Sequence, residues 1–164
     1  MSAVVIVADS VRADFLGGQN GHAVTPFFDG LAAEGALFDT VVSSAPWTVP
    51  SIAAMLTGVY AHRLGLVKWE QPWPEDRPSL FDMAARRGIE VGSFVFDEAH
   101  LFRNAPAAKV RGSSQNVDEM LRWFEARRGE EFVAFVHYWW THVPYVAKPM
   151  SVRSWKKVSD AMLA

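Results

Sequence analysis

Residues 4–9 read VVIVAD, and this stretch decides the fold class. A continuous, mostly β-branched run that ends at a polar residue predicts a strand buried on both faces, as strands are in parallel sheets. The segments 89–96 (IEVGSFVF) and 132–136 (FVAFV) have the same character, and they also stop before a polar residue, Asp97 and His137. These runs therefore predict the centre of a parallel sheet.

Helical patterns separate the predicted strands. Thr25 and Pro26 read as an N-cap and a first helical residue, and Gly35 closes the apolar stripe that follows them. Further helices are predicted at 52–56, at 79–87 and from about residue 115 to the glycine at 129, and a further strand at 36–42. The resulting order, βαβαβαβ, predicts an α/β fold with a mostly parallel central sheet flanked by helices. Since no repeat or linker interrupts it, we expect one domain over residues 1–164.

Composition limits the classes of function. The chain has 164 residues, of which 50% are hydrophobic, and this suits one compact domain or a large piece of a bigger one. A net charge of −2 with scattered basic residues argues against nucleic-acid binding. The absence of cysteine excludes disulfides and thiolate catalysis. The short opening run, broken by Asp9, predicts neither a signal peptide nor a membrane span, so we expect a cytoplasmic protein. The oligomeric state stays open.

Polar residues follow the predicted strands. In open α/β sheets, ligands bind beyond the carboxyl ends of the strands, so these residues are candidates for a site. Carboxylate, hydroxyl and imidazole groups together can bind a divalent metal. The candidates are Asp9, Thr48, Asp97, His137 and His142.

Thr48 lies in SAPWTVPS, residues 44–51, where a turn is expected to become a helix. One interpretation is capping, which is common for threonine at a helix start. The other is nucleophilic chemistry, because the positive end of the helix dipole attracts an anionic substrate and a metal can lower the pKa of the hydroxyl. Asp9 and His137 have structural alternatives as well, a loop cap and a core histidine. His142 lies in a proline-containing loop after a strand, where an imidazole is seldom buried for packing alone. This position favours a functional interpretation of His142.

The predicted strands, helices and loops, taken in their order along the chain, resemble the N-terminal part of the sulfatase branch of the alkaline phosphatase superfamily. The resemblance runs over residues 4–66, resumes at 79–97 and returns at 114–147. Its most characteristic segments are VVIVADSVRADFLG at 4–17, SAPWTVPS at 44–51 and HYWWTHVPY at 137–145. The match is to only the first part of that fold, so the chain is expected to be truncated.

The resemblance implies roles for four residues. Asp9 matches a metal ligand, and Thr48 stands at the family's nucleophile position, bound to the same metal. His142 and His137 match residues that contact the sulfuryl or phosphoryl group. The implied cofactor is a divalent metal ion, with Mn, Zn and Ca as candidates, and the implied partner is a small anionic ester substrate.

Departures from the family pattern change what is expected. Sulfatases carry a cysteine or serine that is oxidised to formylglycine where this chain has Thr48, and an arginine where it has Ile52. Threonine cannot yield that aldehyde, because oxidation at its β-carbon gives a ketone. The resemblance to the phosphoryl-handling branches instead implies direct attack by the threonine on phosphorus. Ser10 replaces the second residue of the family's Asp-Asp pair.

The remaining metal ligands of the family lie downstream of the His-x-Pro-Tyr region, and within residues 148–164 Asp160 is the one candidate carboxylate. A cation held by Asp9, Thr48 and one imidazole is expected to bind weakly. Two hypotheses follow. The chain is part of a metal-dependent, sulfatase-like hydrolase or transferase that acts on a phosphate, phosphonate or sulfate ester through Thr48. Alternatively, it is a truncated, non-catalytic sulfatase-like module that binds an anion or a partner protein.

Overall fold

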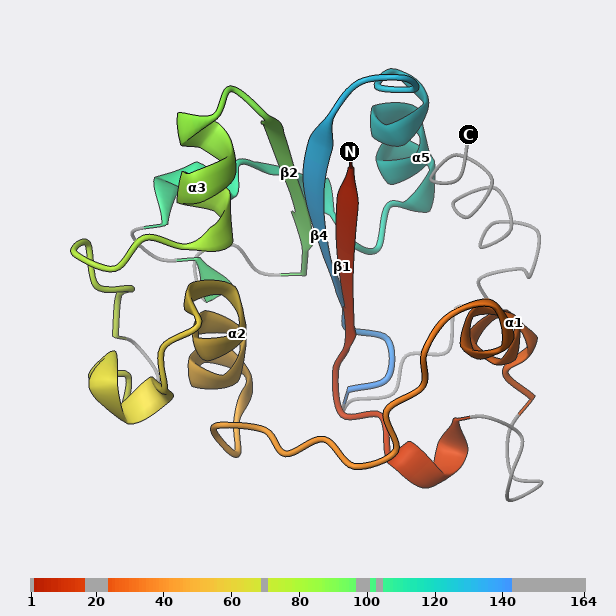
Figure 1. Cartoon of the computed structure of the whole chain (residues 1–164), viewed down its shortest axis with the longest axis horizontal. Coiled ribbons are helices and arrows are strands. Elements are labelled where there is room, and N and C mark those ends of the chain that lie inside the picture. Colours follow the sequence, from red (N-terminus) through yellow and green to blue (C-terminus); the bar gives the residue numbers. More distant parts are fainter. Residues whose placement is uncertain (1, 17–23, 69–70, 97–100, 103–104, 143–164) are drawn as a thin grey trace.

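A computed structural model describes residues 2–16, 24–68, 71–96, 101–102 and 105–142 (Figure 1). Four strands in these ranges form one sheet with the order β1-β4-β2-β3, and every pairing is parallel. The predicted parallel α/β class is therefore confirmed. The strands are β1 (Ala3–Ala8), β2 (Glu90–Val95), β3 (Val110–Ser113) and β4 (Phe132–Tyr138).

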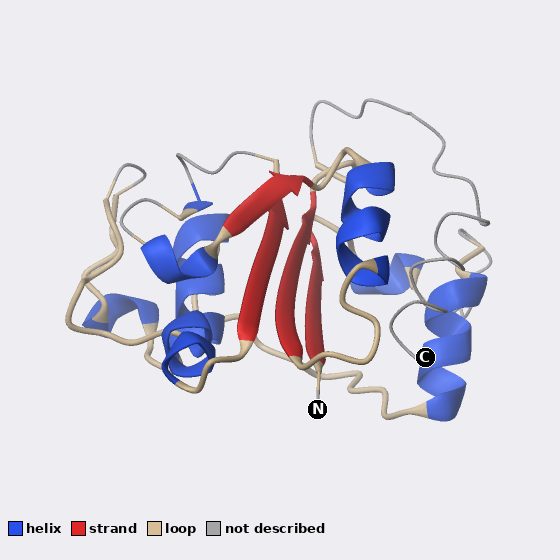
Figure 2. Cartoon of the chain, turned by 90° about the horizontal axis from the view of Figure 1, so that it is seen from above, coloured by secondary structure: helices blue, strands red, loops and turns tan. Residues whose placement is uncertain are grey.

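Helices cover both faces of the sheet, as Figure 2 shows from above. The α2 and α3 helices lie on one side, and α5 lies on the other (Figure 1). None of the helices in the described part of the chain combines the length and apolarity that crossing a bilayer requires. The helices are α1 (Pro26–Glu34), α2 (Thr48–Thr57), α3 (Leu80–Arg86) and α5 (Val117–Glu125), with short 3-10 turns η1 (Ala13–Phe15), η2 (Ala61–Arg63) and η3 (Pro106–Ala108).

The sheet separates two cores, and β4, one of its two central strands, contributes side chains to both. Its side chains alternate between the faces, as the period of a strand requires. Phe135 packs on the side of α2 and α3, whereas Phe132 and Val136 pack on the side of α5. Both faces of β4 are buried, which explains its unbroken apolar sequence.

The first and the last described strands are neighbours. In the β1–β4 register Ala8 lies opposite Tyr138, and the N–H of Asp9 donates to the carbonyl of Tyr138 over 3.0 Å. Because the strands are parallel, the residues that follow each of them meet at the same edge of the sheet. This pairing places the candidate site.

Two strand predictions differ from the structure. The strand expected at 36–42 is wrong, because that segment has no regular structure and its large apolar side chains are 65–88% exposed. None of the four described strands pairs with this segment, so an apolar run alone was not sufficient evidence for a strand. The sequence pattern also missed β3, whose four residues include an arginine and a glycine and which forms by pairing with β2.

The helix predictions fared better. The α1 helix begins at Pro26 after the N-cap Thr25 and ends at Glu34, with Gly35 as its C-cap, as predicted. The α3 helix begins after Ser79, and Gly88, with φ at +72°, follows its end. The helix expected at 52–56 begins four residues earlier, at Thr48. Asp97, one of the predicted strand-end candidates, lies outside the described residues.

Candidate functional site

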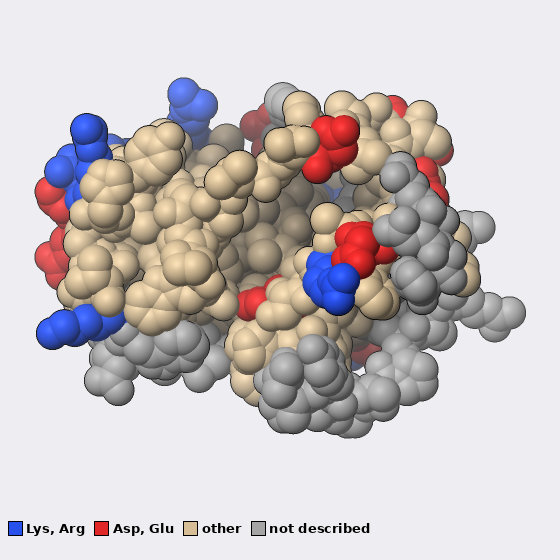
Figure 3. Space-filling view, turned by 90° about the horizontal axis from the view of Figure 1, so that it is seen from below, with Lys and Arg blue, Asp and Glu red and all other residues tan. Residues whose placement is uncertain are grey.

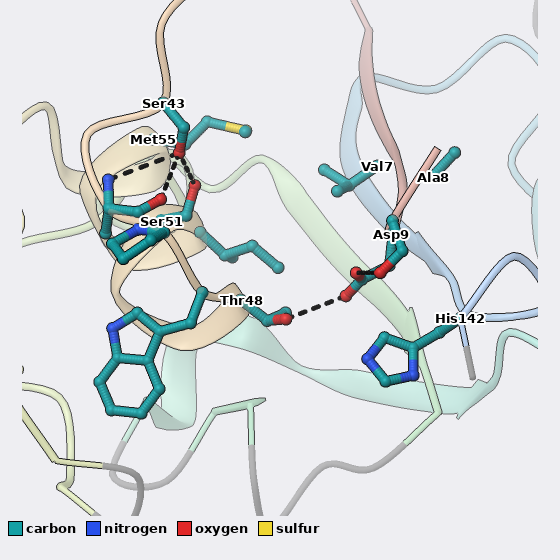
Figure 4. Close-up of a pocket in the computed structure, with 13 residues that line it drawn as sticks. Val7, Ala8, Asp9, Ser43, Thr48, Ser51, Met55 and His142 are labelled. Carbon is teal, nitrogen blue, oxygen red and sulfur yellow. Dashed lines mark hydrogen bonds between the residues drawn. The ribbon is translucent and has the colours of Figure 1, made fainter. Parts of the chain in front are cut away.

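Three of the predicted side chains meet at one carboxylate oxygen. Oδ2 of Asp9 lies 3.0 Å from the Thr48 hydroxyl and 3.0 Å from Nε2 of His137. Figure 4 shows the first of these bonds, with the His142 ring on the same side of the pocket as Asp9. These residues come from the end of β1, the start of α2 and the end of β4.

Asp9 is fixed through its backbone as well as its side chain. Its N–H donates to Tyr138, and its carbonyl accepts a hydrogen bond of 2.5 Å from the Thr141 hydroxyl. Ser10 donates to Oδ1 over 2.8 Å and has a φ of 60°, in the left-handed region that non-glycine residues rarely adopt. The carboxylate is thereby held in one orientation.

Hydrogen bonding also determines the charge of Asp9. Burial raises its pKa, but hydrogen bonds from His137, Ser10 and Thr48 together outweigh that effect and lower the pKa to about 2. The carboxylate is therefore anionic at neutral pH. Since an ionised carboxylate can only accept hydrogen bonds, Nε2 of His137 carries the proton that it donates to Asp9.

Thr48 is the first residue of α2, and its N-cap is Trp47, which makes no capping bond through its side chain. The Thr48 hydroxyl bonds Asp9 instead of the helix backbone, so the capping interpretation of Thr48 is wrong. Val49 and Ile52, which are 1% and 2% exposed, anchor the first turn in the core. The hydroxyl is thus presented at the positive end of the helix dipole.

His137 is both buried and hydrogen-bonded. Its side chain is 4% exposed, and Asp9 is its partner. The core-histidine interpretation is therefore correct as to burial, but the residue that satisfies it is the central carboxylate of the site.

A cavity of about 600 Å³ opens beside these residues. Its polar lining includes Asp9, Thr48, Ser51 and His142, and most of the remainder is apolar. Figure 3 views the molecule from this side and shows a hollow whose visible floor is mostly uncharged. The volume is several times that of a sulfate or phosphate group, so there is room for an organic substituent as well. The cavity lining consists of Val7, Ala8, Asp9, Ser10, Ser43, Ala45, Pro46, Trp47, Thr48, Ser51, Ile52, Met55 and His142.

Sequence reasoning missed two donors at the site. Thr141 was not singled out, and Ser10 was considered only as a missing carboxylate, although it donates to Asp9. No sequence signal identifies either, because their contacts depend on how the loops fold. His62, a histidine outside this site, lies exposed in η2 and stacks on Tyr60.

The donors present fit part of a coordination shell for a hard divalent cation. Asp9 and Thr48 bring an anionic carboxylate and a hydroxyl to one point, and such cations prefer oxygen ligands. Further ligands would be required, since no three His, Asp, Glu or Cys side chains in the described ranges cluster as a metal site.

Comparison with known proteins places these features in context. The family model described as Sulfatase matches residues 2–160. An arylsulfatase of Clostridium perfringens (strain 13 / Type A) is 26% identical over 146 residues, which cover 77% of this chain and 30% of the relative.

Two solved structures share the fold. The phosphonate monoester hydrolase of Agrobacterium radiobacter superposes with a TM-score of 0.72 at 19% identity, covering 93% of this chain and 43% of that protein. A 2-O GAG sulfatase gives a TM-score of 0.69 at 16% identity, covering 92% of this chain and 39% of that protein. The chain thus spans less than half the length of each of these three proteins.

Proposed function

Because this chain belongs to the sulfatase family, whose model matches residues 2–160, we propose that it supplies the nucleophile and one metal ligand of an ester-cleaving site. The observation that carries the proposal is the 3.0 Å hydrogen bond between the Thr48 hydroxyl and Asp9, at the wall of a cavity large enough for an ester. The phosphonate ester named for one structural neighbour and the aryl sulfate implied for the sequence relative suggest the class of substrate.

Thr48 is the proposed nucleophile. Its hydroxyl gives up its proton to solvent water, and its oxygen attacks the phosphorus or sulfur atom as the bond to the ester oxygen breaks. The ester oxygen leaves as an alcohol, and water later hydrolyses the bond between the threonine oxygen and the transferred group. Asp9 orients the hydroxyl but is a poor base, because a carboxylate with a pKa of about 2 has little affinity for the proton. A divalent cation bound by Asp9 and Thr48 would lower the pKa of the Thr48 hydroxyl.

The two histidines take different parts. His142 lines the cavity, and we assign it the contact with the transferred group, where it stabilises charge or protonates the leaving oxygen. His137 does not line the cavity in the described structure and bonds Asp9 instead, so its part is to hold the carboxylate. The resemblance implies that both histidines contact the substrate, and the proposal keeps that role for His142 alone.

Threonine favours phosphorus over sulfur as the centre attacked. The aldehyde hydrate used on sulfate esters cannot form at Thr48, whereas an alcohol oxygen can attack a phosphonate or phosphate ester directly. We therefore propose an aryl phosphonate or phosphate ester as the preferred substrate.

The test compares three chains on p-nitrophenyl esters of phenylphosphonate, phosphate and sulfate with Mn²⁺ present. Thr48→Ser should retain turnover, because it keeps the hydroxyl. Thr48→Val has a similar shape without the hydroxyl and should have no turnover. Equal rates for wild type and Thr48→Val would remove Thr48 from the mechanism.

A non-catalytic, anion-binding module is the second candidate. It is favoured by the single carboxylate that the described residues bring to the site. Calorimetric titration of the chain with Mn²⁺, Zn²⁺ and Ca²⁺ separates the two. Tight, stoichiometric binding of a metal ion that Asp9→Ala removes would contradict the non-catalytic module. Binding of sulfate in the absence of metal, with no ester turnover, would favour it.

A further inference from the structure

Trp139 lies between the two histidines of the site. Its ring stacks on His142 with centroids 3.8 Å apart and planes inclined by 17°, and it meets His137 edge-on at 5.5 Å and 66°. Phe96 stacks on Trp139 at 5.3 Å and 8°. Trp139 thus contacts the histidine that lines the cavity and the histidine that bonds Asp9.

The backbone of this loop is already attached to Asp9. The Thr141 hydroxyl donates to the Asp9 carbonyl, and the His142 N–H closes a turn onto the Trp139 carbonyl over 2.9 Å. These bonds determine where the His142 backbone lies. They do not determine the plane of its ring, because the side-chain torsions remain adjustable.

Stacking restricts that plane. A ring pair with offset-stacked geometry has a preferred separation and orientation, so rotation of the imidazole would break the contact. The nitrogens of an imidazole lie at its edge, so a neighbour that covers its face leaves the edge directed elsewhere. The ring can then present a nitrogen to the cavity in a reproducible direction.

We propose that Trp139 is a positioning residue that fixes the His142 ring at the cavity wall, so that its edge meets the anionic group of the ligand. This proposal rests on the proposed function, because it assumes that His142 contacts the anionic group of the substrate. Phe96 also stacks on the indole, so the Trp139 ring is held by a second aromatic contact besides that with His142.

Trp140 provides the matched control. It is the next residue in the same loop and is also half-buried, but among the described residues it has no ring contact with either histidine. A general disturbance of the loop should therefore follow from Trp140→Leu and from Trp139→Leu alike, whereas loss of positioning should follow only from the second.

The first measurement is NMR of the histidine side chains in the metal-free full chain. Stacking on an indole should shift the His142 ring protons upfield, and Trp139→Leu should remove that shift while Trp140→Leu retains it. If Trp139→Leu does not fold, Trp139→Phe serves instead, and its smaller ring should leave a reduced shift. An unchanged His142 spectrum in the Trp139 variant that folds would overturn the proposal.

The second measurement uses inorganic phosphate as the probe, so that it needs no turnover. Trp139→Leu should weaken phosphate binding about tenfold, Trp139→Phe about threefold or less, and Trp140→Leu not measurably. Equal affinity in wild type and Trp139→Leu would refute a positioning part. Lack of ester turnover by the wild type, with the phosphate difference intact, would count against the proposed hydrolase and leave the assignment of Trp139 standing.

Discussion

The Thr48 hydroxyl donates a 3.0 Å hydrogen bond to the Asp9 carboxylate, although the two residues are 39 positions apart in the chain. Asp9 is attached on its other side to the loop after β4 through Tyr138 and Thr141. The carboxylate therefore connects the helix that carries the proposed nucleophile with the loop that carries His142.

This arrangement predicts how stability depends on pH. The pKa of Asp9 falls from 3.8 to about 2 on folding, so its contribution is fully present above pH 4 and is lost as the pH falls toward 2. The shift corresponds to about 2 kcal/mol. Urea unfolding of metal-free wild type and Asp9→Asn at pH 5 and pH 2.5 should show their difference in unfolding free energy shrinking at the lower pH. A difference that stays constant would contradict the lowered pKa.

Gly92 in β2 should not tolerate alanine. A Cβ there would lie 2.4 Å from Cζ2 of Trp123, whose indole is itself enclosed by Phe94 and by the Arg127 guanidinium 4.2 Å from the ring centroid. We expect Gly92→Ala to destabilise the chain by about 1–3 kcal/mol in chemical denaturation.

Gly30 is the matched control for that substitution. It lies inside α1, and a Cβ at this position meets nothing within 4 Å. Gly30→Ala should stabilise the chain by about 0.5–1 kcal/mol, because alanine is the better helix former. Equal effects of the two substitutions would mean that Trp123 moves aside freely.

The capping box of α3 should contribute measurably to stability. The Ser79 hydroxyl accepts from the Asp82 N–H over 3.3 Å, and the Asp82 carboxylate accepts from the Ser79 N–H over 2.7 Å. Ser79→Ala should cost about 1 kcal/mol of unfolding free energy. A double-mutant cycle with Asp82→Ala measures the coupling, and strictly additive effects would argue against a reciprocal cap.

The segment 36–42 should promote association of the isolated chain. Phe38 is 75% exposed and Val42 is 88% exposed, and contiguous apolar surface of this kind favours self-association. Sedimentation velocity at increasing concentration should show species larger than the 18.3 kDa monomer, reduced by Phe38→Asp. Met83→Lys, at an exposed apolar position of α3, is the control and should change little. A clean monomer at every concentration would contradict the prediction.

Much of the sheet was predictable because its buried strands have a strong sequence signature. The runs at β1 and β4 are apolar on both faces, and parallel strands bring their carboxyl ends to one edge, so the proximity of Asp9 and His137 followed. The α3 boundaries followed from capping chemistry at Ser79. Local signals were sufficient in these cases.

The failures depend on partners that are distant in the chain. The 36–42 run matches a strand pattern, but a strand requires a neighbour that pairs with its backbone, and none of the four described strands pairs with this segment. β3 forms because β2 offers it a free edge, which its own four residues do not reveal. The Ser10 and Thr141 hydrogen bonds likewise depend on a left-handed backbone and a folded loop.

The pairing of β1 with β4 has a consequence for the order in which this molecule is made. The strand that precedes Asp9 leaves the ribosome before the imidazole that bonds Asp9, because His137 is 128 positions further along the chain. Contacts of such separation form slowly, because a long loop must close before they are gained. A nascent chain should thus form its local helices before the environment of this carboxylate, and β1 should stay without its partner strand until β4 has been synthesised.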